Sequence, residues 1–194
     1  NGSINSTVSA NVDAGFSIVS YVGDGSGGAT VGHGLSKAPE MVIIKNRDTG
    51  DWWDVYTETV GNDKKINLNS TTAAVATGAF NSTSPTSTVF SVRYVSGSVH
   101  GTNNLNTDII AYCFHSVDGY SKVGSYTGNG NADGTFVYTG FRPAYMLVKR
   151  TDATEDWWAI DVTRDRINPA YHLLYPNGSN AEYSGGGPGD SNDS

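Results

Sequence analysis

Apolar and polar residues alternate through several short stretches of the chain, which is the pattern of half-buried β-strands. The clearest strands predicted in the N-terminal half are Phe16–Val22, Glu40–Lys45, Trp52–Thr57, Thr88–Val95 and Asp108–Ser116. Glu40–Lys45 is almost entirely apolar, so we expect both of its faces to be buried. A further short strand is predicted at Lys65–Asn69. Thr71–Ala79 is weakly patterned and fits either one helical turn or a loop.

The sequence contains an internal repeat. Gly15–Gly27 (GFSIVSYVGDGSG) is matched by Gly119–Asn131 (GYSKVGSYTGNGN), and each copy follows a Val-Asp pair. The other matched stretches are Ala38–Lys45 with Arg142–Lys149, and Asp51–Val55 with Asp156–Ile160. Strands are therefore predicted in the second copy at Lys122–Thr127, Gly134–Tyr138, Tyr145–Lys149 and Trp157–Val162. A duplicated unit with many turns and aromatic residues predicts a modular β protein.

We therefore expect an all-β fold of two related β-sandwich-like units, with boundaries at 1–117 and 118–182 and a flexible Gly/Ser/Asp tail at 183–194. Aligning Leu68 with Leu173 places Ser194 opposite Val89, so the second unit lacks counterparts of the last two strands of the first. An incomplete sheet exposes an unpaired edge. Either the chain continues beyond Ser194, or another strand covers the edge, for which Ser6–Asn11 and a neighbouring chain are the candidates.

Composition agrees with this fold and narrows the function. The chain has 194 residues, of which 24 are Gly, and the abundance of Gly, Ser, Thr and Asn favours turns over helices. The net charge of −7 excludes nucleic acid as an expected partner. No apolar run reaches the length that spans a membrane. The single cysteine, Cys113, excludes an internal disulfide, and we expect it in the core with His115 partly buried nearby.

The two Trp pairs are the strongest candidates for a binding surface. Because neighbouring residues on a strand face opposite ways, Trp53 with Val55 and Trp158 with Ile160 are predicted to point inward. Trp52 and Trp157 then point outward. The candidate ligand or partner surface consists of Trp52, Trp157, Asp54 and Tyr56, an aromatic platform for a sugar ring or a partner protein. The alternative is that both faces are covered within a two-layer sandwich.

Candidate chemistry is otherwise sparse. Asn129, Asn131 and Asp133 match the start of a calcium loop, but Gly140 stands at the twelfth position where an acidic ligand belongs. A glycine-rich hairpin turn is therefore the preferred interpretation of this stretch, and we expect no metal or other cofactor. The histidines lack the spacing of zinc ligands, and neither a nucleophile elbow nor a phosphate loop occurs. We expect a protein that is not an enzyme.

Four long stretches resemble a known family. They are GFSIVSYVGDGSGGATVGHGL, APEMVIIKNRD, NSTSPTSTVFSV and AYCFHSVDGYSKVGSYTGNGNADGTFVYTGFRPAYMLVKRTD. The combination looks like a repeat domain of tail-fibre-like virion proteins of marine bacteriophages, notably those of cyanobacteria and abundant ocean bacteria. The resemblance covers about Ser3 to Tyr183. Members of that family usually continue with further strands past the equivalent of Ser194.

The resemblance implies a virion appendage, either a tail fibre or a surface fibre, exposed outside the particle and serving host-surface attachment. Its partners would be other copies of itself, with a trimer as the first expectation, other virion proteins and a host-surface glycan. The second hypothesis is a purely structural subunit, such as a capsid decoration, a knob or a filament protomer. The third is a carbohydrate-binding module of a glycan-active enzyme. The resemblance transfers no catalytic residues.

Overall fold

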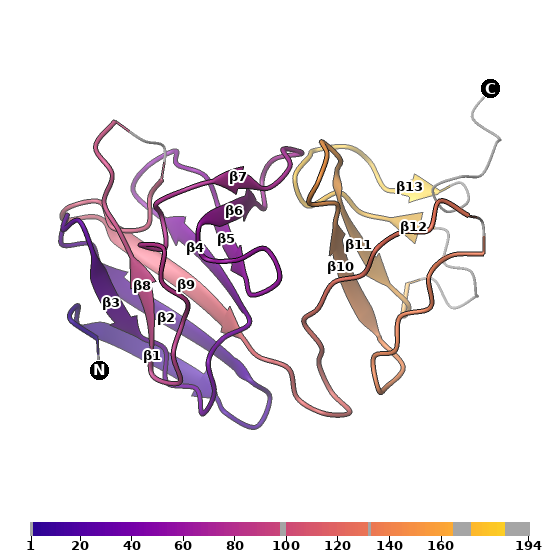
Figure 1. Cartoon of the computed structure of the whole chain (residues 1–194), viewed down its shortest axis with the longest axis horizontal. Helices are drawn as coiled ribbons and strands as arrows, with labels where there is room; N and C mark the ends of the chain where they lie inside the picture. Colours follow the sequence, from indigo (N-terminus) through magenta and orange to yellow (C-terminus); the bar gives the residue numbers. More distant parts are fainter. Residues whose placement is uncertain (1, 98–99, 132, 165–171, 185–194) are drawn as a thin grey trace.

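The computed structural model describes residues 2–97, 100–131, 133–164 and 172–184, and every regular element in them is a β-strand (Figure 1). The strands are β1 (Ser6–Asn11), β2 (Phe16–Val22), β3 (Ala29–Gly32), β4 (Met41–Asn46), β5 (Asp54–Thr57), β6 (Lys64–Asn67), β7 (Val75–Ala76), β8 (Val89–Val92), β9 (Asp108–Phe114), β10 (Tyr145–Lys149), β11 (Trp157–Asp161), β12 (His172–Leu173) and β13 (Tyr183–Ser184). The predicted all-β class is confirmed. Among these residues, none forms a helix with the length and apolarity that membrane crossing requires.

The first unit is a two-layer sandwich. Its main sheet has the order β1-β2-β9-β4-β5-β6-β7, and the second layer is the pair β3-β8. The core lies between them and is formed by alternate residues of the central strands, among them Val19, Val42 and Ala111, facing Val31 and Phe90 of the smaller layer. The strand predicted over Phe16–Val22 is found with the same bounds. β3 lies in a glycine-rich stretch that alternation does not mark.

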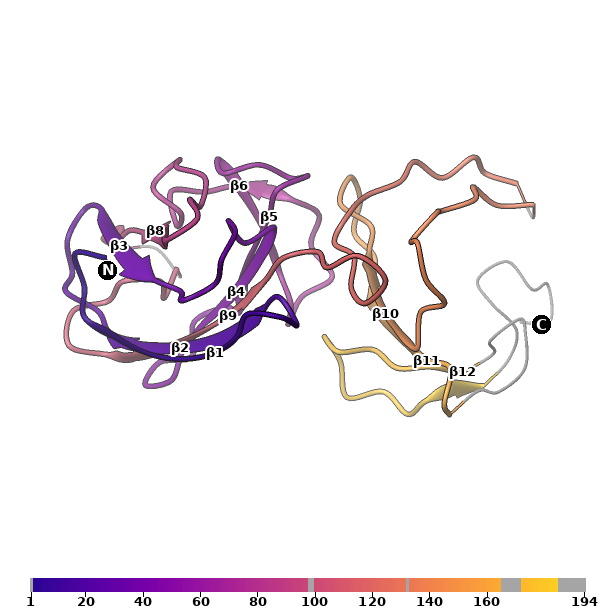
Figure 2. The ribbon, with the colours of Figure 1, turned by 90° about the horizontal axis from the view of Figure 1, so that it is seen from below.

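The second unit repeats only part of this arrangement. β10 and β11 pair antiparallel, as their repeat counterparts β4 and β5 do. β13 pairs with β12, and Leu174, directly after β12, forms an isolated bridge with Ala159 of β11. The two pairs β10-β11 and β12-β13 therefore follow one another in the order of β4-β5 and β6-β7, without forming one continuous sheet. Figures 1 and 2 show the two units side by side, joined by the chain that leaves β9.

Several predictions for individual segments were wrong. Lys122–Thr127 and Gly134–Tyr138 form no strand in the described residues. Their counterparts in the first unit pair with β9 and β8, and the described second unit offers no such partners. Ser6–Asn11 is a strand, but it pairs with β2 and does not cover the second unit. The weak stretch Thr71–Ala79 contains the short strand β7.

The predicted tail 183–194 falls mostly outside the described residues. Its first two residues belong to β13 and therefore take part in a regular pair.

The second hairpin has a different register from the first. Ile44 lies opposite Asp54, and the repeat alignment would place their counterparts, Val148 and Ala159, opposite each other. Instead, Val148 lies opposite Trp158, and Ala159 lies opposite Leu147. The loop explains the slip, because residues 46–50 separate Lys45 from Asp51, whereas the longer stretch 150–155 separates Lys149 from Asp156. A one-residue slip exchanges the two faces of a strand.

Candidate functional site

The exchanged face of β11 makes the contact between the two units. Trp157 is 3% exposed and packs in an apolar cluster with Ile43, Val55 and Ile66, so it lies against the outer face of the first sheet. Its indole N–H donates to the carbonyl oxygen of Asn67 at 2.8 Å. Leu147 of β10 packs against the same cluster. The apolar strand β4 is thereby buried on both faces, as its sequence predicts.

Backbone hydrogen bonds extend this contact. The N–H of Ala74 donates to the carbonyl of Thr151 at 2.8 Å, and the N–H of Glu155 donates to the carbonyl of Thr71 at 2.9 Å. The Lys149 ammonium also donates to the Thr71 carbonyl at 3.1 Å. The loop that lengthens the second hairpin is therefore fixed to the first unit. The two repeats are held by apolar packing and by directional bonds.

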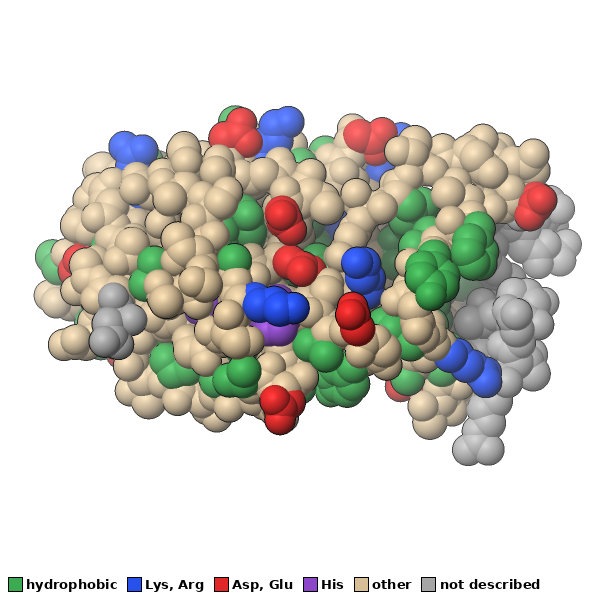
Figure 3. Space-filling model, turned by 60° about the horizontal axis from the view of Figure 1, so that its bottom comes forward, with side chains coloured by type: hydrophobic (Ala, Val, Ile, Leu, Met, Phe, Trp, Pro, Cys, Tyr) green, Lys and Arg blue, Asp and Glu red, His purple; other side chains and the backbone are tan. Residues whose placement is uncertain are grey.

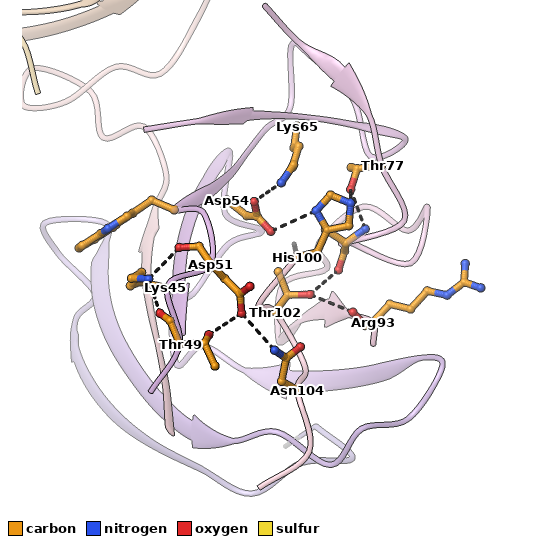
Figure 4. Close-up of polar contacts among 12 residues, drawn as sticks. Lys45, Thr49, Asp51, Asp54, Lys65, Thr77, Arg93, His100, Thr102 and Asn104 are labelled. Atoms are coloured by element: carbon orange, nitrogen blue, oxygen red, sulfur yellow. Dashed lines mark hydrogen bonds and ion pairs between the residues drawn. The ribbon is translucent and has the colours of Figure 1, made fainter. Parts of the chain in front are cut away.

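A second cluster of interest is a buried charge pair inside the first unit. Asp54 opens β5 and Lys65 lies in β6, and the Lys65 ammonium donates to the Asp54 carboxylate (Figure 4). The two side chains are 1% and 2% exposed. His100 approaches from the loop before β9, with its Nδ1 3.8 Å from the other carboxylate oxygen. Such a pair is costly to bury and requires both partners to be present.

Burial also sets the protonation of this cluster. It raises the pKa of Asp54 to about 6, although the Lys65 ammonium opposes the shift. Burial lowers the pKa of His100, and the nearby Lys65 charge adds to that effect. Burial therefore favours the neutral imidazole of His100 beside the Asp54–Lys65 pair.

Surrounding polar groups tie loops together around this pair (Figure 4). The Lys45 ammonium donates to the carbonyls of Thr49 and Asp51 at 3.0 and 2.8 Å. The Asp51 carboxylate accepts from the Asn104 amide at 3.1 Å. The buried Thr102 hydroxyl is placed to donate to the carbonyls of Ala79 and Arg93, at 3.0 and 3.1 Å. These contacts join the loop before β5 to the loops on either side of β8. The polar cluster therefore has a structural role, which is to hold these loops together.

An open surface hollow lies away from this charge cluster. A surface hollow of about 530 Å³ is lined by the N-terminal segment, β1, the end of β3 and the turn before β8, and none of its lining residues belongs to the charge cluster. Within the described residues, no three His, Cys, Asp or Glu side chains are grouped so that they could hold a metal ion.

The predicted aromatic platform is wrong for three of its four residues. Trp157 is buried between the units, Asp54 is paired with Lys65, and Tyr56 is 3% exposed with its ring against Phe80 at a centroid distance of 5.6 Å. Trp52 is half-buried. Val55 and Tyr56 do lie on opposite faces, but the face predicted to point outward is the one that faces the sandwich core. The alternative stated from the sequence, that both faces are covered, is what the structure shows for this strand.

The inward prediction for the other two Trp residues is only partly met. Trp53 is partly buried in the inter-unit cluster together with the fully buried Val55. Trp158 and Ile160 are half-buried on the opposite face of β11. The register slip explains this difference between the two copies.

The other sequence-level predictions concern Cys113, His115 and the turn at Asn129. Cys113 is fully buried, and His115 is 4% exposed. In the turn, the side-chain oxygens of Asn129 and Asn131 each accept a backbone N–H two residues ahead, at 3.1 Å. The Asn129 amide donates to the Asp133 carbonyl at 2.8 Å. These bonds are those of a self-supported polar turn. The flanking described residues form no strand pair, so the β-hairpin expected around this turn is wrong.

Sequence reasoning missed Lys65 and His100 as parts of the polar cluster. The sequence contained one signal for the Asp54–Lys65 pair, because these residues carry opposite charges and lie in short strands that follow one another along the chain. Two such strands pair as a hairpin, which brings their side chains together. His100 comes from a long loop, and no local pattern places it there.

The model of a family described as a domain of unknown function (DUF7483) matches residues 1–192. No curated protein matches the chain, and no solved structure does.

Proposed function

The chain belongs to this DUF7483 family, and we propose that it is a non-enzymatic building block of a bacteriophage virion appendage, a tail fibre or surface fibre that contributes to host-surface attachment. The proposal includes a location on the virion surface, outside the cell. Its partners are further copies of the same chain, with a trimer as the first expectation, other virion proteins and a host-surface glycan. Nucleic acid, membrane insertion and cofactors are not part of it.

The observation that carries the proposal is the fixed contact between the two repeats. Trp157 of the second unit fills an apolar cluster on the first, and the Thr71 and Thr151 carbonyls accept backbone hydrogen bonds across the same boundary. A protein that displays surface along an appendage needs repeats held in a defined orientation. The resemblance to tail-fibre-like virion proteins supplies the particle context.

The ionisable groups support a role without catalysis. A glycosidase needs two carboxyl groups facing a bond in an open cleft, roughly 5–10 Å apart. Here Asp54 is buried against Lys65, and Asp51 is engaged with Asn104 and Thr49. Both carboxylates hold loops of the sandwich.

Immunogold electron microscopy of purified phage particles tests the location. Antibodies raised against the purified chain should label a tail or surface appendage, and antibodies pre-absorbed with the chain should not. Attachment is tested in parallel by adding the purified chain to host cells before the phage, which should reduce adsorption in a dose-dependent way. Absence of label from intact particles would overturn the virion assignment.

A purely structural subunit is the second candidate, and one specific observation favours it. The aromatic platform expected to bind a ligand is largely inside the molecule, whereas the second unit leaves apolar residues exposed. In the two experiments above, labelled particles together with undiminished adsorption would select the structural role over attachment.

A further inference from the structure

Residues 119–131 and 133–140 of the second unit, here termed the unpaired arm, form almost no regular secondary structure. Apart from a bridge between Val117 and Ser121 at its start, its described residues belong to no strand. Figure 2 shows the arm leaving the first unit, running outward and returning to β10. Its exposed apolar side chains include Phe136 at 87% and Tyr138 at 79% exposure. Figure 3 shows apolar side chains gathered on the surface of the second unit.

The first unit shows what the same sequence does when its partners are present. β2 pairs with β1 on one side and with β9 on the other. Its Tyr21 is 4% exposed and donates its hydroxyl to the Thr102 carbonyl at 2.7 Å. With Gly124 as one extra residue in the second copy, Ser20–Gly23 matches Ser125–Gly128. The repeat counterpart of Tyr21 is then Tyr126, which is 56% exposed. The arm therefore carries the residues of a central strand without the neighbours that bury them.

Two glycines give independent support. A Cβ on Gly23 would lie 2.1 Å from the Asn104 carbonyl oxygen, in the loop that leads into β9. Gly23 also donates its N–H to the Thr107 carbonyl at 3.0 Å and accepts from the Asn106 N–H at 2.9 Å. Its counterpart Gly128 has nothing within 4 Å of the same position. In the first unit, the close approach of the Asn104 carbonyl requires a glycine at position 23. In the second unit, no described atom near Gly128 would exclude a side chain.

We propose that the second unit is an acceptor for one more β-strand, which enters between the arm and β10 as β9 lies between β2 and β4. The strand it accepts has the character of Asn103–Phe114: a polar loop that fits against Gly128, then an alternation like that of Ile109, Ala111 and Cys113 facing the core. The donor to which we commit is a further stretch of this same repeat.

The strands in the described part of the chain do not supply the donor. β1 is largely polar and is engaged with β2, and β9 is the centre of the first sheet. The edge of β10 away from β11 has no strand partner among the described residues. Pairing there would convert the exposed edge and the arm into a sheet equivalent to the first, as occurs in β-strand addition.

The test extends the full chain after Ser194 with a copy of Phe90–Val117, the stretch that follows Val89 in the first unit. Amide hydrogen exchange is followed by mass spectrometry over residues 119–128 and 145–149. We expect exchange in both segments to slow by about tenfold or more. The matched control carries Ile109→Asp, Ala111→Asp and Cys113→Asp in the appended copy only, and should exchange like the unextended chain. Unchanged exchange with the matched extension, or equal slowing with the control, would overturn the proposal.

Two further measurements keep the test decisive. Protection of β2 and β9 in the first unit reports whether the extended protein is folded. If it is not, a synthetic peptide of Asn103–Ser116 is added to the unextended chain and should give saturable protection of the same two segments; no protection overturns the proposal. Sedimentation over a range of concentrations identifies self-association. Protection of the arm in the unextended chain that follows dimer formation would assign this surface to a second copy instead.

Discussion

The indole N–H of Trp157 donates to the backbone carbonyl of Asn67 across 2.8 Å, so a residue of the second repeat completes the hydrogen bonding of a strand in the first. The same ring packs in the apolar cluster on the outer face of the first sheet. One side chain therefore contributes both directional bonding and apolar burial to the inter-unit contact.

Trp157→Ala is expected to lower the free energy of unfolding by about 3–5 kcal/mol, because a buried aromatic ring is lost and a cavity remains. Trp157→Phe keeps most of the apolar contact and loses the bond to Asn67, so it should cost about 1–2 kcal/mol. Urea denaturation followed by circular dichroism measures both. Trp158→Ala, at the half-buried position next along β11, is the matched control and should cost less than Trp157→Ala. Equal losses at the two positions would contradict the assigned faces.

The strands of the first unit could be predicted because their signals are local. Alternation in β2 and the apolar run in β4 each follow from which faces are buried, and the structure places both strands where those patterns lie. The face of β11 could not be predicted in this way. It depends on one additional residue in the loop between β10 and β11. The repeat alignment places a gap there, and a gap does not indicate that the strand register changes.

The polar cluster shows a different limit. The alternation predicts Asp54 on an exposed platform because it lies two residues after Trp52, on the same expected outward face. Its pairing with Lys65 depends on which strands are neighbours, and the approach of His100 depends on a loop that is distant in sequence. The strands expected in the arm failed for a related reason, since a strand needs a partner and the sequence alone does not show whether that partner is present.

The Asp54–Lys65 pair predicts strong coupling between two substitutions. Lys65→Met leaves a buried carboxylate without its counter-charge, so it should cost about 3–5 kcal/mol at pH 7. Asp54→Asn leaves the ammonium unpaired but also removes a carboxylate whose ionised form is disfavoured by burial, so it should cost less. The double variant removes both charges and should cost clearly less than the sum. Chemical denaturation of the four proteins in the cycle gives the coupling energy. Additive losses would show that the two side chains do not stabilise each other.

The raised pKa of Asp54 predicts how stability depends on pH. Its folded value of about 6 lies above the ordinary value of 3.8, so between these values the folded state binds more protons than the unfolded state. This group's contribution is therefore fully present below about pH 4 and is lost as the pH rises through 6. The stability of the native chain minus that of Asp54→Asn should increase as the pH falls from 7 to 4, by on the order of 2–3 kcal/mol. Denaturation curves at several pH values measure it, and a difference that decreases towards pH 4 would mean that the pKa is lowered.

Cys113 should be inert towards alkylation in the folded protein. Burial raises the pKa of its thiol to about 12, so the thiolate that reacts is scarce at pH 8, and the side chain is fully covered. Intact mass after incubation with iodoacetamide should show no adduct under native conditions and one adduct in denaturant. Rapid labelling of the native chain would indicate that the sheet around β9 opens readily.

Gly23 and Gly128 occupy corresponding positions and should respond differently to the same substitution. Gly23→Ala forces a Cβ against the Asn104 carbonyl oxygen, so the loop entering β9 must move and the hydrogen bonds to Asn106 and Thr107 weaken. We expect a loss of about 2–3 kcal/mol, since both packing and buried bonds are disturbed. Gly128→Ala meets open space and should change stability by less than about 0.5 kcal/mol. Thermal and urea denaturation of the two variants decide this. A large loss with Gly128→Ala would mean that the arm is already packed against a partner, and a negligible loss with Gly23→Ala would remove the close contact on which the comparison of the two units depends.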